Sequence, residues 1–448
     1  MTSEAVRFTV ALIGLSGCVL LAGCRPSVPS RPLKVVVSGD TAGWIVPCGC
    51  TSSQSGGLPR RASFVDGLGS EADTIVADVG GALQGTSPYD RAKFEAILRG
   101  EMLMGIAAHN IGASEAKLGP AELRRLAGKV SLPLLSSNVR DRAGQFVGQP
   151  VLIRSAGGRR VALVGVLAER YATKELQVSS PRQAVSEALL RADGQYQSAI
   201  VLAYLPEDEL RLLAEALPEV DAVLGGPTGQ PIAPKQLGPT LLASATSKGK
   251  FVVELDAPPV HSIDHWTGRI VELGERFADD PRQMANVRQS RRDLAAWDFA
   301  PKQTGFAEPL PAGLPKGYAV AGTGSCRKCH TADGEAWQKS KHAGAWKALV
   351  ATGAHVDPEC QRCHTTGYGL PGGFASARRS TALVEVGCES CHGPSQGHAA
   401  DPTVHTLHFR QAGNQCRGCH DRENSPKFVY DEYWRKIQHG QKVTGSAR

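Results

Sequence analysis

The 448-residue sequence contains few aromatic residues, no blocks of basic residues and, beyond its first two dozen residues, no long apolar run. No second stretch of 18 apolar residues occurs, which excludes a membrane-spanning helix downstream of the N-terminus. The net charge of +7 is spread along the chain, unlike the basic patches that bind nucleic acid. We therefore expect no nucleic-acid partner, and the length predicts more than one domain.

The N-terminus has the features of an export signal. Arg7 precedes an apolar run from Phe8 to Gly23, which is too short to span a bilayer and typical of a signal peptide. The run ends in Leu21-Ala22-Gly23-Cys24, which resembles a bacterial lipobox; the resemblance implies a lipid on Cys24 and a membrane anchor. The alternative is an ordinary cleaved signal with a coincidental cysteine. Both interpretations predict an exported protein of the cell envelope or periplasm.

Residues from about 33 to 257 alternate β-branched runs with helical patterns. Near-continuous apolar strands separated by helices predict an α/β domain with buried strands. The expected strands are 34–37, 73–77, 160–166, 198–202 and 250–255, the last of which should close the domain. The expected helices are 88–108, 120–127, 181–192 and 207–216.

The remaining composition divides the chain further. The predicted parts are a signal peptide (1–24), a Pro/Ser-rich tether (25–32), the α/β domain (33–257), a connector (258–324) and a last domain (325–448). The connector contains a charged helix at 279–300, followed by a Pro/Gly-rich linker. The last domain has little strand pattern and many Gly and His residues, so something other than a conventional apolar core must organise it.

Eight of the twelve cysteines lie in that last domain, in four copies of Cys-x-x-Cys-His. The copies are Cys326–His330, Cys360–His364, Cys388–His392 and Cys416–His420, with second cysteines at Cys329, Cys363, Cys391 and Cys419. Two thiols one helical turn apart can form thioethers with one haem, and the adjacent histidine can reach the iron. Zinc sites and disulfides are the alternatives, but neither explains a histidine after every second cysteine. We therefore expect four covalently attached c-type haems.

Six histidines of this domain lie outside the motifs: His342, His355, His398, His405, His408 and His439. A second imidazole makes a haem iron six-coordinate and suited to electron transfer, whereas a vacant position can bind a small ligand. Spacing alone does not assign these histidines.

Three segments, Trp337–Ala343, Cys388–Pro394 and Ser425–Phe428, resemble the tetrahaem cytochrome c-554 family, and the likeness covers about residues 318 to 445. It implies a mainly α-helical, low-secondary-structure multihaem cytochrome c domain. The ligand pairs that it implies are His420 with His342, His330 with His398, and His392 with His439. It also implies a five-coordinate second haem on His364. His355 could close that haem, whereas His405 and His408 are more typical of surface residues.

The α/β region resembles the metallophosphoesterase domain of periplasmic 5'-nucleotidases. The likeness rests on Ser38–Gly43, Gly56–Ala62, Ala77–Gly81, Ile111–Glu115 and Leu224–Gln230. It implies a metallophosphoesterase-like sandwich, but among the metal-ligand positions only Asp40 keeps a ligand. The other positions hold Ala42, Gly81, Ala113, Ser114, Tyr204, Pro227 and Gly229. One ligand cannot hold two metals, so phosphatase activity is not expected.

The same domain contains Pro47-Cys48-Gly49-Cys50 after its first strand, where α/β sheets place ligands. Cys48 and Cys50 could form a redox-active pair or a metal site, or a structural disulfide. The histidines His109, His261 and His265 have no recognisable partners and are interpreted as ordinary surface or packing residues.

Two functional hypotheses follow. In the first, the protein is an envelope-anchored electron carrier that serves redox partner proteins. In the second, it is an oxidoreductase acting on a small nitrogen or sulfur species at the open haem, or on a thiol substrate at Cys48 and Cys50.

Overall fold

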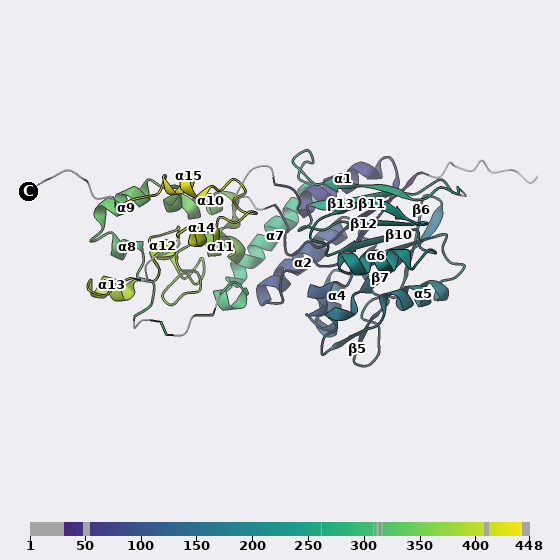
Figure 1. Cartoon of the computed structure of the whole chain (residues 1–448), viewed down its shortest axis with the longest axis horizontal. Helices are drawn as coiled ribbons and strands as arrows, with labels where there is room; N and C mark the ends of the chain where they lie inside the picture. Colours follow the sequence, from purple (N-terminus) through teal and green to yellow (C-terminus); the bar gives the residue numbers. More distant parts are fainter. Residues whose placement is uncertain are drawn as a thin grey trace, which may run out of the picture. The chain divides into compact units, whose positions relative to one another are not determined.

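The computed structural model describes residues 31–47, 54–260, 262–307, 309–310, 313–314, 317–406 and 412–440 (Figure 1). These residues belong to one compact unit, Arg31–Arg448. The predicted signal peptide with Cys24, the pair Cys48 and Cys50, and the histidines His261 and His408 lie outside the described ranges. None of the helices within these ranges is both long and apolar enough to cross a membrane.

Two six-stranded sheets form the centre of the α/β region. The first has the order β14-β13-β1-β2-β3-β4 and the second the order β11-β12-β10-β9-β7-β6. The first comprises β1 (Leu33–Ser38), β2 (Asp73–Asp78), β3 (Ala108–Asn110), β4 (Leu134–Leu135), β13 (Phe251–Asp256) and β14 (Thr267–Glu272). The second comprises β6 (Leu152–Ala156), β7 (Arg159–Leu167), β9 (Ser198–Tyr204), β10 (Ala222–Gly226), β11 (Ile232–Leu237) and β12 (Thr240–Ser244). A separate pair is β5 (Val139–Asp141) with β8 (Leu176–Val178).

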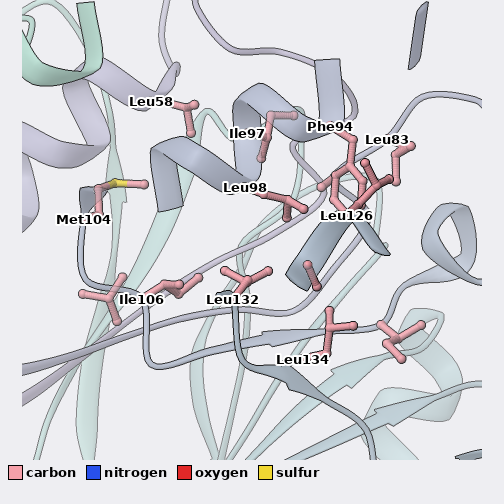
Figure 2. Packing of buried hydrophobic residues seen from close by; sticks show 14 of the residues in the cluster. Leu58, Leu83, Phe94, Ile97, Leu98, Met104, Ile106, Leu126, Leu132 and Leu134 are labelled. Carbon is pink, nitrogen blue, oxygen red and sulfur yellow. The ribbon is translucent and has the colours of Figure 1, made fainter. Parts of the chain in front are cut away.

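The alternation of side chains along β1 explains how the layers pack. Val35 and Val37 point to one face and share a buried cluster with Leu163 and Ile200 of the second sheet. Val36 points to the other face, into the cluster shown in Figure 2, which contains Leu58, Phe94 and Leu126. These three belong to α1 (Leu58–Gly69), α2 (Pro88–Leu103) and α4 (Pro120–Lys129). Helices α5 (Pro181–Arg191) and α6 (Glu207–Glu215) cover the second sheet, which completes an α/β/β/α sandwich.

The predicted strands are present as β1, β2, β7, β9 and β13, but the first sheet does not end there. β14 pairs antiparallel with β13 as a further edge strand, so the prediction that 250–255 closes the domain was wrong. Its side chains are mostly exposed, which is why it lacks the apolar pattern of the buried strands. The charged helix α7 (Pro281–Trp297) also packs on this sandwich. Its Gln283 and Asn286 side chains donate hydrogen bonds to backbone carbonyls of α2.

The helix at Pro88 starts as predicted but ends five residues early. Ser87 caps α2 by accepting a hydrogen bond from the Asp90 backbone, while the Asp90 carboxylate accepts from the Ser87 backbone. The chain then turns through Gly105, which has a φ of 71°, and enters β3.

The C-terminal region consists of short helices without a sheet within the described residues. They are α8 (Thr323–Cys326), α9 (Thr331–Gln338), α10 (Ala345–Thr352), α11 (Pro358–His364), α12 (Glu389–His392), α13 (Gln396–Ala400), α14 (Ala412–Arg417) and α15 (Tyr430–Trp434). From residue 325 onward, the buried apolar side chains of the described part are those of Ala345, Leu349, Pro358, Phe374 and Pro394. Protein side chains alone therefore do not form a core of ordinary size there.

Candidate functional site

Each attachment motif forms a turn of helix. The backbone N–H groups of His330, His392 and His420 donate to the carbonyl oxygens of the first cysteines of their motifs, at 2.9, 2.9 and 2.8 Å. In the second motif, α11 itself contains both cysteines and His364. Residues spaced by three and four lie on the same face of a helix, so each motif presents two thiols and one imidazole to one side.

Three pairs of histidines face each other. The ring centroids are 6.2 Å apart for His330 and His398, 6.2 Å for His342 and His420, and 6.0 Å for His392 and His439. Two imidazoles on opposite sides of one metal, with bonds of about 2 Å, place their centroids roughly 6 Å apart. The structure thus brings together the pairs that the cytochrome resemblance implies, at centroid distances that match two imidazoles on one metal ion.

Three histidine rings of this region, one of them from the second motif, each use one ring nitrogen in a hydrogen bond to the backbone. Nδ1 of His364, His398 and His439 lies 2.8 Å from the carbonyl oxygens of Ala345, Val404 and Ile437, respectively. A carbonyl only accepts, so Nδ1 carries the proton and Nε2 has a lone pair available for a metal. Such a hydrogen bond also fixes the ring orientation.

The cysteines and histidines do not form a zinc site. Among the described residues, one group of side chains converges closely enough to hold a metal ion, namely Asp78, Glu101 and His109. This group contains no cysteine and no histidine of the C-terminal region. A tetrahedral zinc site needs four convergent ligands, whereas a haem needs only two axial ones because the porphyrin supplies the rest. None of the eight cysteines of the motifs is in a disulfide, and the thiols of Cys326 and Cys388, like those of Cys363 and Cys419, lie close to each other. The residues present therefore fit haem better than zinc.

The second motif differs from the other three. No ring contact joins His364 to another histidine within the described part of the chain, and the ring of His355 lies instead against Trp346, with centroids 5.8 Å apart. Burial and then the charge of Arg291 lower the pKa of His355, so this imidazole is neutral. His405 is exposed.

The predicted centre of the α/β domain is filled by its own side chains. A Cβ atom on Gly81 would lie 2.7 Å from the ring of Tyr204 and 3.1 Å from the Asp40 backbone. The Asp40 carboxylate accepts a hydrogen bond of 2.8 Å from the Thr246 hydroxyl, and burial raises its pKa. Burial likewise raises the pKa of Tyr204, which keeps the phenol neutral. A bridging carboxylate at position 81 has no space beside this tyrosine.

Comparison with known proteins agrees with the geometry of the haem motifs. Residues 325–393 match the family model described as Cytochrome c554 and c-prime. Cytochrome c-554 of Nitrosomonas europaea is 30% identical over 109 residues, which are 21% of this chain and 46% of that protein. The C-terminal region is a cytochrome c-554 domain.

The α/β domain has the fold of calcineurin-like phosphoesterases. The 5'-nucleotidase precursor of Thermus thermophilus superimposes with a TM-score of 0.51 at 18% identity, covering 60% of each chain. The phosphoesterase YfkN of Bacillus subtilis gives 0.51 at 15% identity, covering 59% of this chain and 98% of YfkN. The uncharacterized metallophosphoesterase YunD of Bacillus subtilis is 26% identical over 38% of this chain and 39% of its own length. The protein thus spans less than half of each curated relative that it matches.

A buried charged cluster beneath the phosphoesterase-like centre was not evident from the sequence. Arg61, only 1% exposed, donates hydrogen bonds to the hydroxyl groups of Ser38 and Thr41, both 2.9 Å long, and lies 3.4 Å from Asp78. The Asp78 carboxylate also accepts from the Ser38 hydroxyl and the Gly80 backbone. Its two oxygens are therefore already occupied, although Asp78 lies within metal-binding distance of Glu101 and His109.

His109 has two carboxylate partners, contrary to the interpretation from sequence. Its Nδ1 lies 2.9 Å from Glu101, and its Nε2 lies 3.6 Å from Glu115. Burial would lower the pKa of His109, but Glu101 and Glu115 outweigh burial and the pKa is raised. Glu115 in turn accepts the backbone N–H groups of Gly81 and Ala82. This charged histidine therefore supports the loop that replaces a metal ligand.

A polar junction joins the two domains near the fourth motif. Glu423, three residues after His420, pairs with Lys248 and with Lys250, the latter at 3.0 Å. The Lys248 ammonium also lies 4.5 Å from the ring centre of Trp44, and the Gln54 side chain donates to the Glu423 carbonyl. Residues from the α/β domain therefore hold the segment that directly follows the fourth motif.

Proposed function

We propose that the protein is an exported, lipid-anchored electron carrier whose cytochrome domain holds four covalent haems. The observation that carries this proposal is the set of three facing histidine pairs beside four attachment motifs. The sulfur atoms would come from Cys326, Cys329, Cys360, Cys363, Cys388, Cys391, Cys416 and Cys419. The iron ligands would be His330, His398, His342, His420, His392, His439 and His364. Cys24 would carry the lipid, and envelope redox proteins would be the partners.

The bound haem would supply a one-electron couple of Fe(III) and Fe(II). The paired imidazoles would be the residues that hold the iron of three haems, and such bis-imidazole ligation favours electron transfer over ligand binding. The hydrogen bonds to Nδ1 keep the ligand nitrogen in place as the charge of the site changes. The phosphoesterase-like domain (33–257), without its metal ligands, would act as a docking or positioning module for the cytochrome domain (325–448).

The wild-type protein tests this proposal directly. After expression in a host that matures c-type cytochromes, its mass should include four haems. The EPR spectrum of the oxidised protein should show mainly low-spin iron, with one high-spin haem in four. Fewer than four haems, or high-spin iron throughout, would contradict the proposed ligands.

A second candidate function is an oxidoreductase that binds a small nitrogen or sulfur species at the haem on His364. The position of His355 against Trp346 favours it, because no described histidine ring faces His364. The high-spin EPR signal should then change on addition of nitric oxide or hydroxylamine. A further variant of this function is a thiol substrate at Cys48 and Cys50.

Hydrolysis of phosphate esters is expected to be absent. With added manganese or zinc, the protein should cleave 5'-nucleotides no faster than the buffer with the same metal, since two metals need several protein ligands and Tyr204 fills the site. A metal-dependent rate that Asp40→Ala abolishes would contradict this prediction.

A further inference from the structure

The strongest unexplained feature of the molecule is a second junction, between α2 of the phosphoesterase-like domain and α11 of the cytochrome domain. The Lys93 ammonium lies 3.1 Å from the Glu359 carboxylate and 3.4 Å from that of Asp357. The Tyr89 hydroxyl donates a hydrogen bond of 2.6 Å to the other oxygen of Asp357. Tyr89 and Lys93 are one turn apart on α2, so both reach the same point on α11.

This junction is largely buried. The Lys93 side chain is 10% exposed, and its ammonium lies 5.4 Å from the centre of the Tyr89 ring. Burial would lower the pKa of Lys93, but the two carboxylates outweigh burial and the pKa is raised. Tyr89 also packs with Leu294 and Phe299, and Val356 of the cytochrome domain packs against the same cluster. Apolar contacts and charge pairing thus fix the two helices to each other.

The junction leads directly to the second haem motif. Asp357 caps α11 by accepting a hydrogen bond of 3.0 Å from the Glu359 backbone, and the same helix carries Cys360 and His364. Glu359 directly precedes Cys360 in α11, so the Lys93 ammonium at 3.1 Å from Glu359 lies next to an attachment cysteine. A positive charge in this buried position acts on an attached porphyrin through a medium of low polarity.

We infer that α2 of the phosphoesterase-like domain forms part of the second haem site, with Lys93 as a positioning residue whose charge sets the reduction potential of the haem on His364. This inference rests on the proposed haem attachment at Cys360 and Cys363. A positive charge nearby disfavours ferric iron relative to ferrous iron, so Lys93 raises the potential of that haem. The domain that has lost its metal centre would thereby keep a function in redox chemistry.

The test is a spectroelectrochemical titration of the full-length holoprotein. Lys93→Met should shift the potential of the haem on His364, followed by its high-spin optical bands, to a lower value. Glu359→Gln removes a negative charge from the same junction and should shift it to a higher value. Lys93→Arg keeps the charge and should restore the wild-type potential. The matched control is Lys129→Met, which removes an exposed lysine paired with Glu95 in the same domain and should change nothing.

A background without the second haem makes the assignment independent of spin state. In Cys360→Ala/Cys363→Ala, the additional change Lys93→Met should leave the three remaining potentials unchanged. The inference is overturned if folded Lys93→Met and Glu359→Gln leave all potentials as in the wild type, or if all four haems shift alike. A haem count below four in the wild type would instead contradict the proposed function, so the two failures are distinguishable.

Discussion

Replacing His398 with alanine is expected to double the high-spin fraction of the oxidised protein, from one haem in four to two. The rings of His330 and His398 face each other at 6.2 Å, and Nδ1 of His398 is held by the Val404 carbonyl. Removal of this imidazole leaves the first haem with His330 as its sole protein ligand, and five-coordinate ferric haem is high-spin. Quantitative EPR of the oxidised holoprotein measures the change.

His405→Ala is the matched control for this experiment, because His405 is exposed on the segment just beyond α13. It should leave the spectrum unchanged. Added imidazole should return His398→Ala toward the wild-type low-spin spectrum by occupying the vacant position. An unchanged high-spin fraction in His398→Ala, with four haems still attached, would remove His398 from the ligand set and with it the proposed pairing.

Replacing Arg61 with leucine is expected to destabilise the phosphoesterase-like domain by about 3–5 kcal/mol, the usual cost of leaving a buried charge unpaired. Arg61 is almost fully buried, and leucine would leave the Asp78 carboxylate without its cation. The hydroxyl of Thr41 would lose its donor as well. Hydrogen exchange of the β1 and β2 amides in urea reports the free energy of unfolding of this domain separately from the cytochrome domain.

The control for Arg61 is Arg125→Leu, because Arg125 pairs with Glu122 on the domain surface with half of its side chain exposed. That change should cost less than about 1 kcal/mol. Equal protection of β1 and β2 in Arg61→Leu and in the wild type would show that the buried cluster contributes no net stability.

The fold was predictable where burial gives the sequence a clear pattern. Strands such as β7 and β9 are buried on both faces and therefore read as continuous apolar runs. β14 was missed because an edge strand with one solvated face needs few apolar residues. The end of α2 was placed too late because Gly105, not a change of hydrophobicity, ends the helix.

The candidate site was predictable only in part, for a physical reason. The attachment motifs are local and visible in the sequence, whereas the pairing of His342 with His420 joins residues far apart and came from a family resemblance. The burial of Arg61 and Lys93 could not be predicted from the sequence, because arginine and lysine are also the usual residues on the exposed faces of amphipathic helices. Only the packing in the folded structure shows that these two side chains are buried.

The thiol pairs Cys326–Cys388 and Cys363–Cys419 affect how the protein can be assembled. Each pair takes one sulfur from each of two motifs, and neighbouring thiols are readily oxidised to a disulfide outside a reducing compartment. One such cross-link would block attachment at two motifs at once. With haem attached as proposed, these thiols must therefore stay reduced until each has reacted with its own porphyrin.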